Sequence, residues 1–333
     1  MEPTPAGRVR ARRVPALGGI LPRAARLNAK PLGRLMTVYL DQNKWIELAR
    51  MHHGKDKSLR ARKILRVFEA AKGSAAAVFP LSSFHYIETA RISNVGRKVR
   101  LGAAMWHFSQ GTTLLAYEAI VRHELEAALA KHFSALKPGP LKILGRGHTH
   151  AFAVPALRGT LSLFEEEVER SILTGNERLG ITPPAFRGMA HRENFRSHLS
   201  TLRARCQDIP KELRDNWLYA TSTIDILNPI NDVMAKHGLE KSAIEALGEQ
   251  QLKQLLEDMP TRRLDLHLHR QVLRNPQYVA RHSDLEDWGG LVVASCYCDV
   301  VVCERHMADM LRRDGCSTAA RVETDLEDVL SAA

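Results

Sequence analysis

Short apolar runs alternate with longer segments of helical spacing near both ends of the chain. The runs lie at Thr37–Leu40, Ala75–Leu81, Asp299–Cys303 and Ala320–Glu323, and most are apolar or β-branched without strict alternation. Such runs are typical of strands that are buried on both faces. Because helical segments separate them, we expect the strands to be parallel and to form one central sheet.

Helical spacing of apolar residues follows the predicted strands. The predicted helices cover 44–51, 58–72, a segment that Ser82 or Ser83 caps, 284–295 and 305–313. A serine in the capping position accepts hydrogen bonds from the first free N–H groups of a helix. The alternation of strand and helix at both ends predicts an α/β domain.

The chain from about 95 to 275 is dominated by helical patterns. The predicted helices there are 97–109, 116–133, 160–173, 190–207, 221–236, 241–257 and 261–274. A turn-rich segment at 137–150 separates two groups of these helices, and the sequence has no internal repeat. We therefore predict an α/β domain built from 36–94 and 280–333, interrupted by a large α-helical insertion at 95–279.

Residues 1–35 differ from the rest of the chain in composition. They contain five Pro, no aromatic residue and no sustained helical or strand period, so they can bury too little apolar surface to offset chain entropy. We expect a disordered basic tail, or a segment that precedes a natural start at Met36. Seven Arg and Lys30 against Glu2 give this segment a charge of +7, out of +11 for the whole chain. The remainder is only mildly basic, so net charge alone is weak support for a nucleic-acid partner.

Composition excludes several classes of protein. With 44% hydrophobic and 26% charged residues, the 333-residue chain can form a large core. No stretch reaches the ~18 consecutive apolar residues that a membrane helix needs. Five cysteines, an odd number, do not suggest a disulfide framework and favour a reduced, cytoplasmic protein. We interpret Cys296 and Cys298 as buried small residues rather than zinc ligands, because no second pair with zinc spacing follows.

Carboxylates stand where predicted strands end or predicted helices begin. They are Asp41, Glu88, Asp284, Asp287 and Glu304. The carboxyl ends of parallel strands share one edge of a sheet, and ligands bind there in α/β proteins. Several carboxylates at one site need a cation to neutralise them, and oxygen ligands suit Mg²⁺ or Mn²⁺. Each acid taken alone is more readily explained as a helix cap or surface charge, but the set predicts a metal site.

Two segments of the first half resemble the opening motifs of PIN-domain nucleases. Val38–Ile46 (VYLDQNKWI) is similar to the first motif, an apolar strand followed by Asp, one further residue and Asn. Here those residues are Asp41 and Asn43. Ser83–Arg91 (SFHYIETAR) is similar to the second motif, a helix that carries a Glu, here Glu88.

The segment DLEDWGGLVVASCYCDVVVCERHM resembles the last two motifs of the same family. They consist of an acid at a helix start, an apolar strand and a further acid. Asp284 or Asp287 matches the third acidic position and Glu304 the fourth. The family usually has Asp at the fourth position, after a residue with a hydroxyl group, whereas this chain has Cys303 and the longer Glu304. Activity or metal affinity is therefore expected to differ from that of the family.

The resemblance implies a three-layer PIN-like fold and a divalent-metal-dependent nuclease, most often acting on RNA. The acidic residues would hold Mg²⁺ or Mn²⁺, and Asn43 would orient Asp41 or a water on the ion. Candidates to contact substrate phosphates are Lys44, Arg91, Arg97 and Arg305. The resemblance covers roughly 36–94 and 280–323, so the helical insertion lies outside it.

Other interpretations stay open. An inactive PIN-like module whose insertion binds a protein partner is favoured by Glu304, and a DNA nuclease fits the same acids. An antitoxin is a further candidate partner, although this chain is much longer than the small PIN toxins. The H-x-H pairs His148/His150 and His267/His269 lack a clustered acid or an H-E-x-x-H motif, which disfavours a zinc hydrolase. The chain has neither a P-loop nor a G-x-S-x-G motif.

Overall fold

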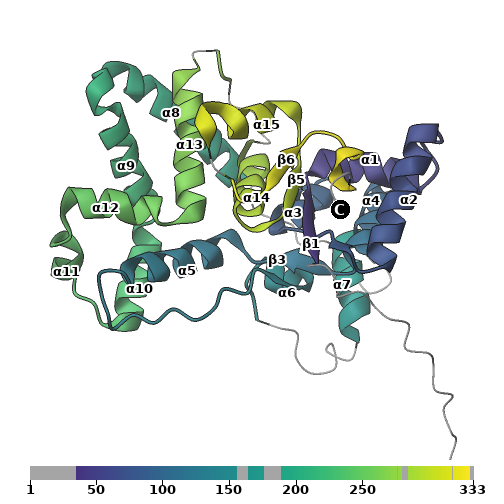
Figure 1. Cartoon of the computed structure of the whole chain (residues 1–333), viewed down its shortest axis with the longest axis horizontal. Coiled ribbons are helices and arrows are strands. Elements are labelled where there is room, and N and C mark those ends of the chain that lie inside the picture. Colours follow the sequence, from purple (N-terminus) through teal and green to yellow (C-terminus); the bar gives the residue numbers. More distant parts are fainter. Residues whose placement is uncertain are drawn as a thin grey trace, which may run out of the picture. The chain divides into compact units, whose positions relative to one another are not determined.

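A small parallel sheet joins the two ends of the chain. The computed structural model describes residues 35–155, 164–175, 189–275, 277–279, 284–316 and 318–330. The strands are β1 (Met36–Leu40), β2 (Ala77–Val78), β5 (Val300–Val302) and β6 (Arg321–Glu323). They pair in the order β2-β1-β5-β6, and all three pairings are parallel, as the sequence predicts. The first strand and the last two therefore lie side by side (Figure 1).

Alternate residues of the central strands pack into two different cores. Val38 and Leu40 of β1 join the core formed with the helices α1 (Gln42–His52) and α2 (Leu59–Gly73). Tyr39 points to the opposite side, into the core that contains α14 and α15. Those helices are α14 (Asp284–Tyr297) and α15 (Arg305–Arg312). Both faces of the sheet are therefore buried, which explains why its strands read as continuous apolar runs.

Polar caps fix where the first helices begin. Asp41 caps α1, Ser58 caps α2, and Asn94 caps α4 (Val95–Ser109). Ser82 caps α3 (Ser83–Ala90), so one of the two predicted capping serines is confirmed. Each cap accepts hydrogen bonds from N–H groups that the helix cannot pair itself.

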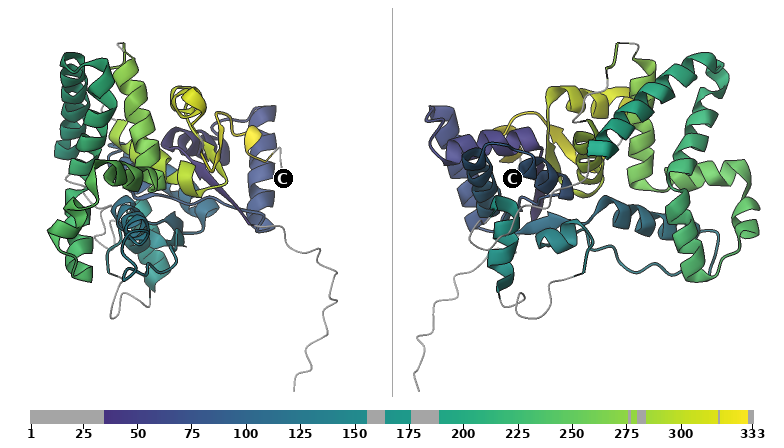
Figure 2. Two further views of the ribbon diagram at one scale, coloured as in Figure 1. Left: turned by 60° about the vertical axis from the view of Figure 1, so that its left-hand side comes forward. Right: turned by 180° about the vertical axis from the view of Figure 1, so that it is seen from behind.

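The middle of the chain is mostly helical, but two predicted helices are divided. The helices are α5 (Tyr117–Leu129), α7 (Glu165–Thr174), α8 (Met189–Asp208), α9 (Arg214–Asp225), α10 (Leu227–His237), α11 (Lys241–Glu245), α12 (Gly248–Glu257) and α13 (Pro260–Arg274). The predicted helix 221–236 is divided at Ile226, between α9 and α10. The predicted helix 241–257 is divided before Gly248, whose φ of +76° is unfavourable for residues other than glycine. Figure 2 shows α9, α10, α12 and α13, drawn in green, gathered together.

A second, two-stranded sheet was not expected from the sequence. β3 (Thr112–Leu114) pairs with β4 (Leu144–Arg146) in antiparallel fashion, and the short helix α6 (Gly147–Ala151) follows. Three-residue strands contain too few positions for a periodic pattern to emerge. A parallel bridge between Leu81 and Thr113 connects this two-stranded sheet to the segment after β2.

The predicted insertion shares buried side chains with the sheet region. Its first helix, α4, contributes Leu101 and Phe108 to the core beside β1. Further on, the Arg262 guanidinium lies 3.1 Å from the Asp265 carboxylate in α13, and the Trp288 indole of α14 donates a hydrogen bond of 2.9 Å to Asp265. The helical middle is therefore held to the sheet region by apolar packing and by a buried polar network.

No helix among the described residues is both long and apolar enough to cross a bilayer.

Candidate functional site

Asp41 and Glu304 lie at the same edge of the sheet. Asp41 directly follows β1, and Glu304 lies two residues beyond β5, the parallel neighbour of β1. The Asp41 N–H donates to the Val302 carbonyl over 2.9 Å, which extends the pairing up to the acid itself. The shared edge that the sequence predicts for these two acids is therefore present.

Asp41 is a buried carboxylate in an unfavourable environment. The residue is 8% exposed, and its Oδ1 accepts a hydrogen bond of 2.8 Å from the Gln42 N–H. Burial raises the pKa of Asp41 to about 6; the Gln42 bond and the Lys44 charge oppose this rise, while the Glu304 charge adds to it. A buried acid beside a second acid is stabilised by protonation or by a cation.

Asn43 connects the two strand ends through Glu304. Its side-chain amide donates to the Glu304 carboxylate over 2.5 Å. The sequence-based expectation gave Asn43 a role toward Asp41 or a water on the ion, but the partner in the structure is Glu304. Because Asn43 belongs to the first turn of α1, the bond fixes Glu304 relative to the helix that Asp41 caps.

Glu88 approaches the same region from α3. Burial raises the pKa of the Tyr39 hydroxyl well above its usual range, and the charges of Asp41 and Glu88 raise it further. The Tyr39 hydroxyl is 3.3 Å from that of Ser82, the cap of α3. Glu88, the second predicted acid, therefore acts electrostatically on a residue of β1 that Asp41 also influences.

A neutral histidine holds α3 against the end of β1. The Nδ1 of His85 accepts from the Ser82 N–H over 2.9 Å, so its Nε2 carries the proton and donates to the Leu40 carbonyl over 2.9 Å. Burial lowers the pKa of His85 to about 3, although the Leu40 bond partly opposes this. His85 therefore positions the residue immediately before Asp41. His85 precedes Glu88 by one helical turn on α3, and this spacing is the sequence signal that could have predicted its positioning role.

Two glycines bring α14 close to Tyr39 and α3. A Cβ on Gly290 would overlap the Tyr39 hydroxyl, and a Cβ on Gly289 would overlap the Phe84 ring. Asp284 is the first residue of this helix and Asp287 lies within its first turn. The side chains of these two acids are outside the described part, so their predicted place at the site stays a prediction.

The sheet-edge acids are more widely spaced than a set of direct metal ligands. Within the described residues, the group of three metal-ligating side chains whose atoms all lie within 4.8 Å of one another is His52, Glu69 and His107. Asp41, Glu88 and Glu304 do not form such a group. Mg²⁺ usually keeps several of its waters, so an ion can be held at this spacing through one or two direct carboxylates and intervening water.

The basic residues predicted to contact phosphates lie in different settings. Lys44 is directed to the sheet edge, where its Nζ donates to the Thr324 carbonyl over 2.7 Å. Arg305 is exposed directly after Glu304, and Arg97 is exposed in the first turn of α4. Arg91 is half-buried at the end of α3. Among these four residues, Lys44 is the one whose charge lowers the pKa of Asp41.

A further acid at this edge was missed from the sequence. Asp325 follows β6, with its Oδ1 2.6 Å from an Arg60 nitrogen, and Arg60 also lies 2.8 Å from Glu47. Burial raises the pKa of Asp325, but hydrogen bonds from the Glu327 N–H and Arg60 leave it below the usual value. The negative charge of Asp325 is therefore balanced by Arg60, whereas Asp41 forms no such ion pair with another described residue. Its position just after a strand is the same signal that identified the other acids.

The histidine pairs are used in structural contacts. His148 lies 2.8 Å from Glu169, and His150 is 3.0 Å from the Thr113 hydroxyl. On α13 the ring of His267 reaches the Met310 carbonyl, whereas His269 reaches the Asp265 carbonyl. The two rings of each pair thus have different partners.

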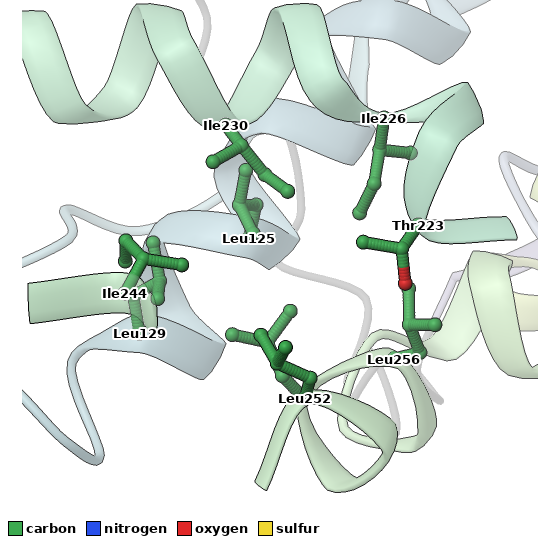
Figure 3. Close-up of a pocket in the computed structure, with 9 residues that line it drawn as sticks. Leu125, Leu129, Thr223, Ile226, Ile230, Ile244, Leu252 and Leu256 are labelled. Atoms are coloured by element: carbon green, nitrogen blue, oxygen red, sulfur yellow. The ribbon is translucent and has the colours of Figure 1, made fainter. Parts of the chain in front are cut away.

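Neither the cysteines nor the apolar pocket offers a reactive group. Cys298 is buried, Cys296 is half-buried, and burial raises the pKa of both thiols. A pocket between the helices of the middle segment is lined by aliphatic side chains such as Leu125 and Ile230 (Figure 3). Its polar oxygen, the Thr223 hydroxyl, donates to the Tyr219 carbonyl. This pocket belongs to the packing of the helices.

Comparisons with protein-family models, with curated proteins and with solved structures find no match to this chain.

Proposed function

We propose that this chain is a divalent-metal-dependent nuclease that hydrolyses phosphodiester bonds in RNA. The observation that carries the proposal is that Asp41 and Glu304 follow the ends of two adjacent parallel strands. The ion would be held by Asp41, Glu88 and Glu304, together with Asp284 or Asp287 from α14. The helices on both faces of a parallel sheet and the order of these acids along the chain support the PIN-like fold as part of the proposal.

The electrostatics of Asp41 favour a bound cation. Its carboxylate is buried and close to Glu304, so ionisation is unfavourable in the protein alone. The residues fit a hard divalent ion, because the donors are carboxylate oxygens and Asn43, which bonds to Glu304, is exposed to water. When bound, Mg²⁺ or Mn²⁺ would supply positive charge to the phosphate and promote the attack of water on phosphorus.

Other residues of the chain would orient the site and its substrate. Asn43 holds the Glu304 carboxylate in one direction, and His85 fixes the strand end that bears Asp41. Lys44 places an ammonium group at the edge without forming a direct ion pair with Asp41. Its charge would attract a phosphate group to the site, with Arg305 nearby in sequence as a second contact.

A cleavage assay with several substrates tests this proposal. Labelled single-stranded RNA, single-stranded DNA and duplex DNA are incubated with the protein and either Mg²⁺ or Mn²⁺. We expect RNA cleavage that chelator abolishes and that Asp41→Asn and Glu304→Gln each remove. The matched control is Asp309→Asn, which changes an exposed acid on α15 and should retain activity.

Each alternative has its own outcome in the same assay. Cleavage confined to DNA would replace RNA as the substrate. If the wild-type protein is as inert as the variants with both ions, the nuclease proposal fails and an inactive module with a protein partner becomes the better account.

A further inference from the structure

A second cluster of metal-binding side chains lies between three helices. His52 is the last residue of α1, Glu69 belongs to α2, and His107 belongs to α4. One ligand atom from each lies within 4.8 Å of the other two. Asp41 caps the start of α1, whereas His52 ends it, so the two sites lie at opposite ends of this helix. The helix is about 16 Å long at 1.5 Å per residue.

The ring of His107 has two partners that a single proton cannot satisfy. Its Nε2 lies 2.7 Å from the Lys72 ammonium and 2.7 Å from Glu69 Oε1. If Nε2 accepts from Lys72, its lone pair also faces the lone pairs of Glu69. If Nε2 is protonated and donates to Glu69, it faces the ammonium group. Either state leaves one contact repulsive, whereas a cation bound by both Nε2 and Oε1 would resolve the conflict.

The Lys72 ammonium occupies the position of a positive charge in the cluster. Its Nζ is also 2.8 Å from Glu69 Oε2 and 5.6 Å from the centre of the Phe108 ring. Three groups that attract cations therefore surround this nitrogen: a carboxylate, an imidazole and an aromatic face. The lysine side chain is long and flexible, so it can turn toward solvent when another cation enters.

Aromatic packing holds both imidazole rings in place. The rings of His52 and His107 lie 4.7 Å apart, and each contacts the ring of Phe108. Phe108 is 1% exposed and packs against Phe68, so it is fixed in the core.

We propose that His52, Glu69 and His107 form a binding site for a divalent transition-metal ion, with Zn²⁺ as the best match, and that Lys72 occupies the site in its absence. Two imidazoles, one carboxylate and a water are a ligand set that suits Zn²⁺, in contrast to the all-oxygen set at the sheet edge. The ion would connect α1, α2 and α4 on one side of the sheet. This site is independent of the proposed nuclease function and is assigned by different residues.

Spectroscopic titration with Co²⁺ tests the site, because tetrahedral Co²⁺ absorbs much more strongly in the visible range than octahedral Co²⁺. The full chain is freed of metal by chelator and titrated with Co²⁺, followed by displacement with Zn²⁺. We expect one strongly absorbing equivalent that Zn²⁺ displaces. His52→Ala and His107→Ala should each weaken binding by at least roughly tenfold.

Two further variants distinguish this site from adventitious binding. His53→Ala is the matched control, because His53 adjoins His52 but its Nε2 bonds to the Arg100 carbonyl; it should retain binding. Lys72→Met removes the competing ammonium and should tighten binding by roughly tenfold. Circular dichroism identifies any variant that fails to fold, and Glu69→Gln then replaces it.

Three results would overturn the proposal. They are the absence of the strongly absorbing Co²⁺ species in the wild-type protein, equal weakening by His52→Ala and His53→Ala, and an affinity that Lys72→Met leaves unchanged. The same titration in the Asp41→Asn background should give the same equivalent, because the sheet edge takes no part in it.

Discussion

Asn43 donates a hydrogen bond to Glu304 across 261 positions of the sequence. One residue is in the first turn of the helix after β1, and the other follows β5. The bond therefore fixes the relation between two strand ends at the point where Asp41 and Glu304 lie close together. A positioning contact of this kind is expected wherever two carboxylates must share one ion.

Removal of this contact should impair catalysis more than folding. In Asn43→Ala the Glu304 side chain becomes free to rotate, and we expect the metal-dependent cleavage rate to fall roughly 10- to 100-fold. Stability should change by less than about 0.5 kcal/mol, because Asn43 is exposed. Cleavage kinetics and urea unfolding measure the two effects.

The matched control for Asn43→Ala is Asn216→Ala. Asn216 is also exposed and accepts a hydrogen bond from Lys253, away from the sheet. It should leave cleavage unchanged. Equal losses of activity in both variants would argue against a specific role for Asn43.

Asp41→Asn should stabilise the metal-free protein at high pH. The folded protein raises the pKa of Asp41 from 3.8 to about 6. The protonated Asp41 carboxyl is therefore best tolerated below about pH 4. As the pH rises through 6, the protein loses a total of about 3 kcal/mol of unfolding free energy at this residue. Asn stays neutral and still caps α1, so the variant should be more stable than wild type by roughly 1–3 kcal/mol at pH 8.

Urea unfolding at pH 8 and pH 4 in chelator measures this difference. The advantage of the variant should vanish at pH 4, and added Mg²⁺ should reduce it at pH 8 by stabilising the wild type. A variant that is destabilised equally at both pH values would show that Asp41 is an ordinary helix cap.

His85 should make the protein sensitive to acid. Its pKa falls from 6.5 to about 3 on folding, so the neutral ring contributes stability that is present above pH 6.5 and is lost as the pH falls toward 3. His85→Gln should be less stable than wild type by roughly 1–3 kcal/mol at pH 7. The difference in unfolding free energy between the wild type and His85→Gln should narrow by about 1.4 kcal/mol per pH unit below 6.5. Unfolding curves across this range test it, and a gap that does not change with pH would contradict the neutral state of His85.

Gly290→Ala should separate α14 from the sheet edge. The added methyl group overlaps the Tyr39 hydroxyl, and we expect a loss of roughly 1–3 kcal/mol in unfolding free energy. Cleavage should also fall, because α14 carries Asp284 and Asp287. Gly73→Ala is the control, since a Cβ there meets nothing within 4 Å; it should stabilise the protein by up to about 1 kcal/mol. A Gly290→Ala variant as stable as Gly73→Ala would refute the close approach.

The sequence predicts the two central strands, β1 and β5, well because nearly all of their residues are buried. Runs such as Val300–Val302 contain apolar residues on both faces, and this pattern depends little on distant contacts. The two-stranded sheet of β3 and β4 is different: Leu144–Arg146 is exposed or half-buried and has no apolar period. Its pairing depends on tertiary contacts that local propensity does not encode.

The candidate site is predictable in part for the same reason. Asp41 and Glu304 end apolar runs, so parallel topology alone brings them to one edge. The hydrogen-bond partner of Asn43 depends on the direction of its side chain, which the spacing of residues in the sequence does not reveal. The three ligands of the second cluster lie on separate helices, and only the packing of α1, α2 and α4 brings His52 near His107.

Direct measurement of Mn²⁺ binding by electron paramagnetic resonance tests the central claim that Asp41 and Glu304 share one divalent ion. We expect Asp41→Asn and Glu304→Gln each to weaken binding by at least roughly tenfold, while Asp309→Asn and His52→Ala bind as the wild type does. Equal Mn²⁺ affinity in all five proteins would contradict the claim that these two carboxylates form a metal site.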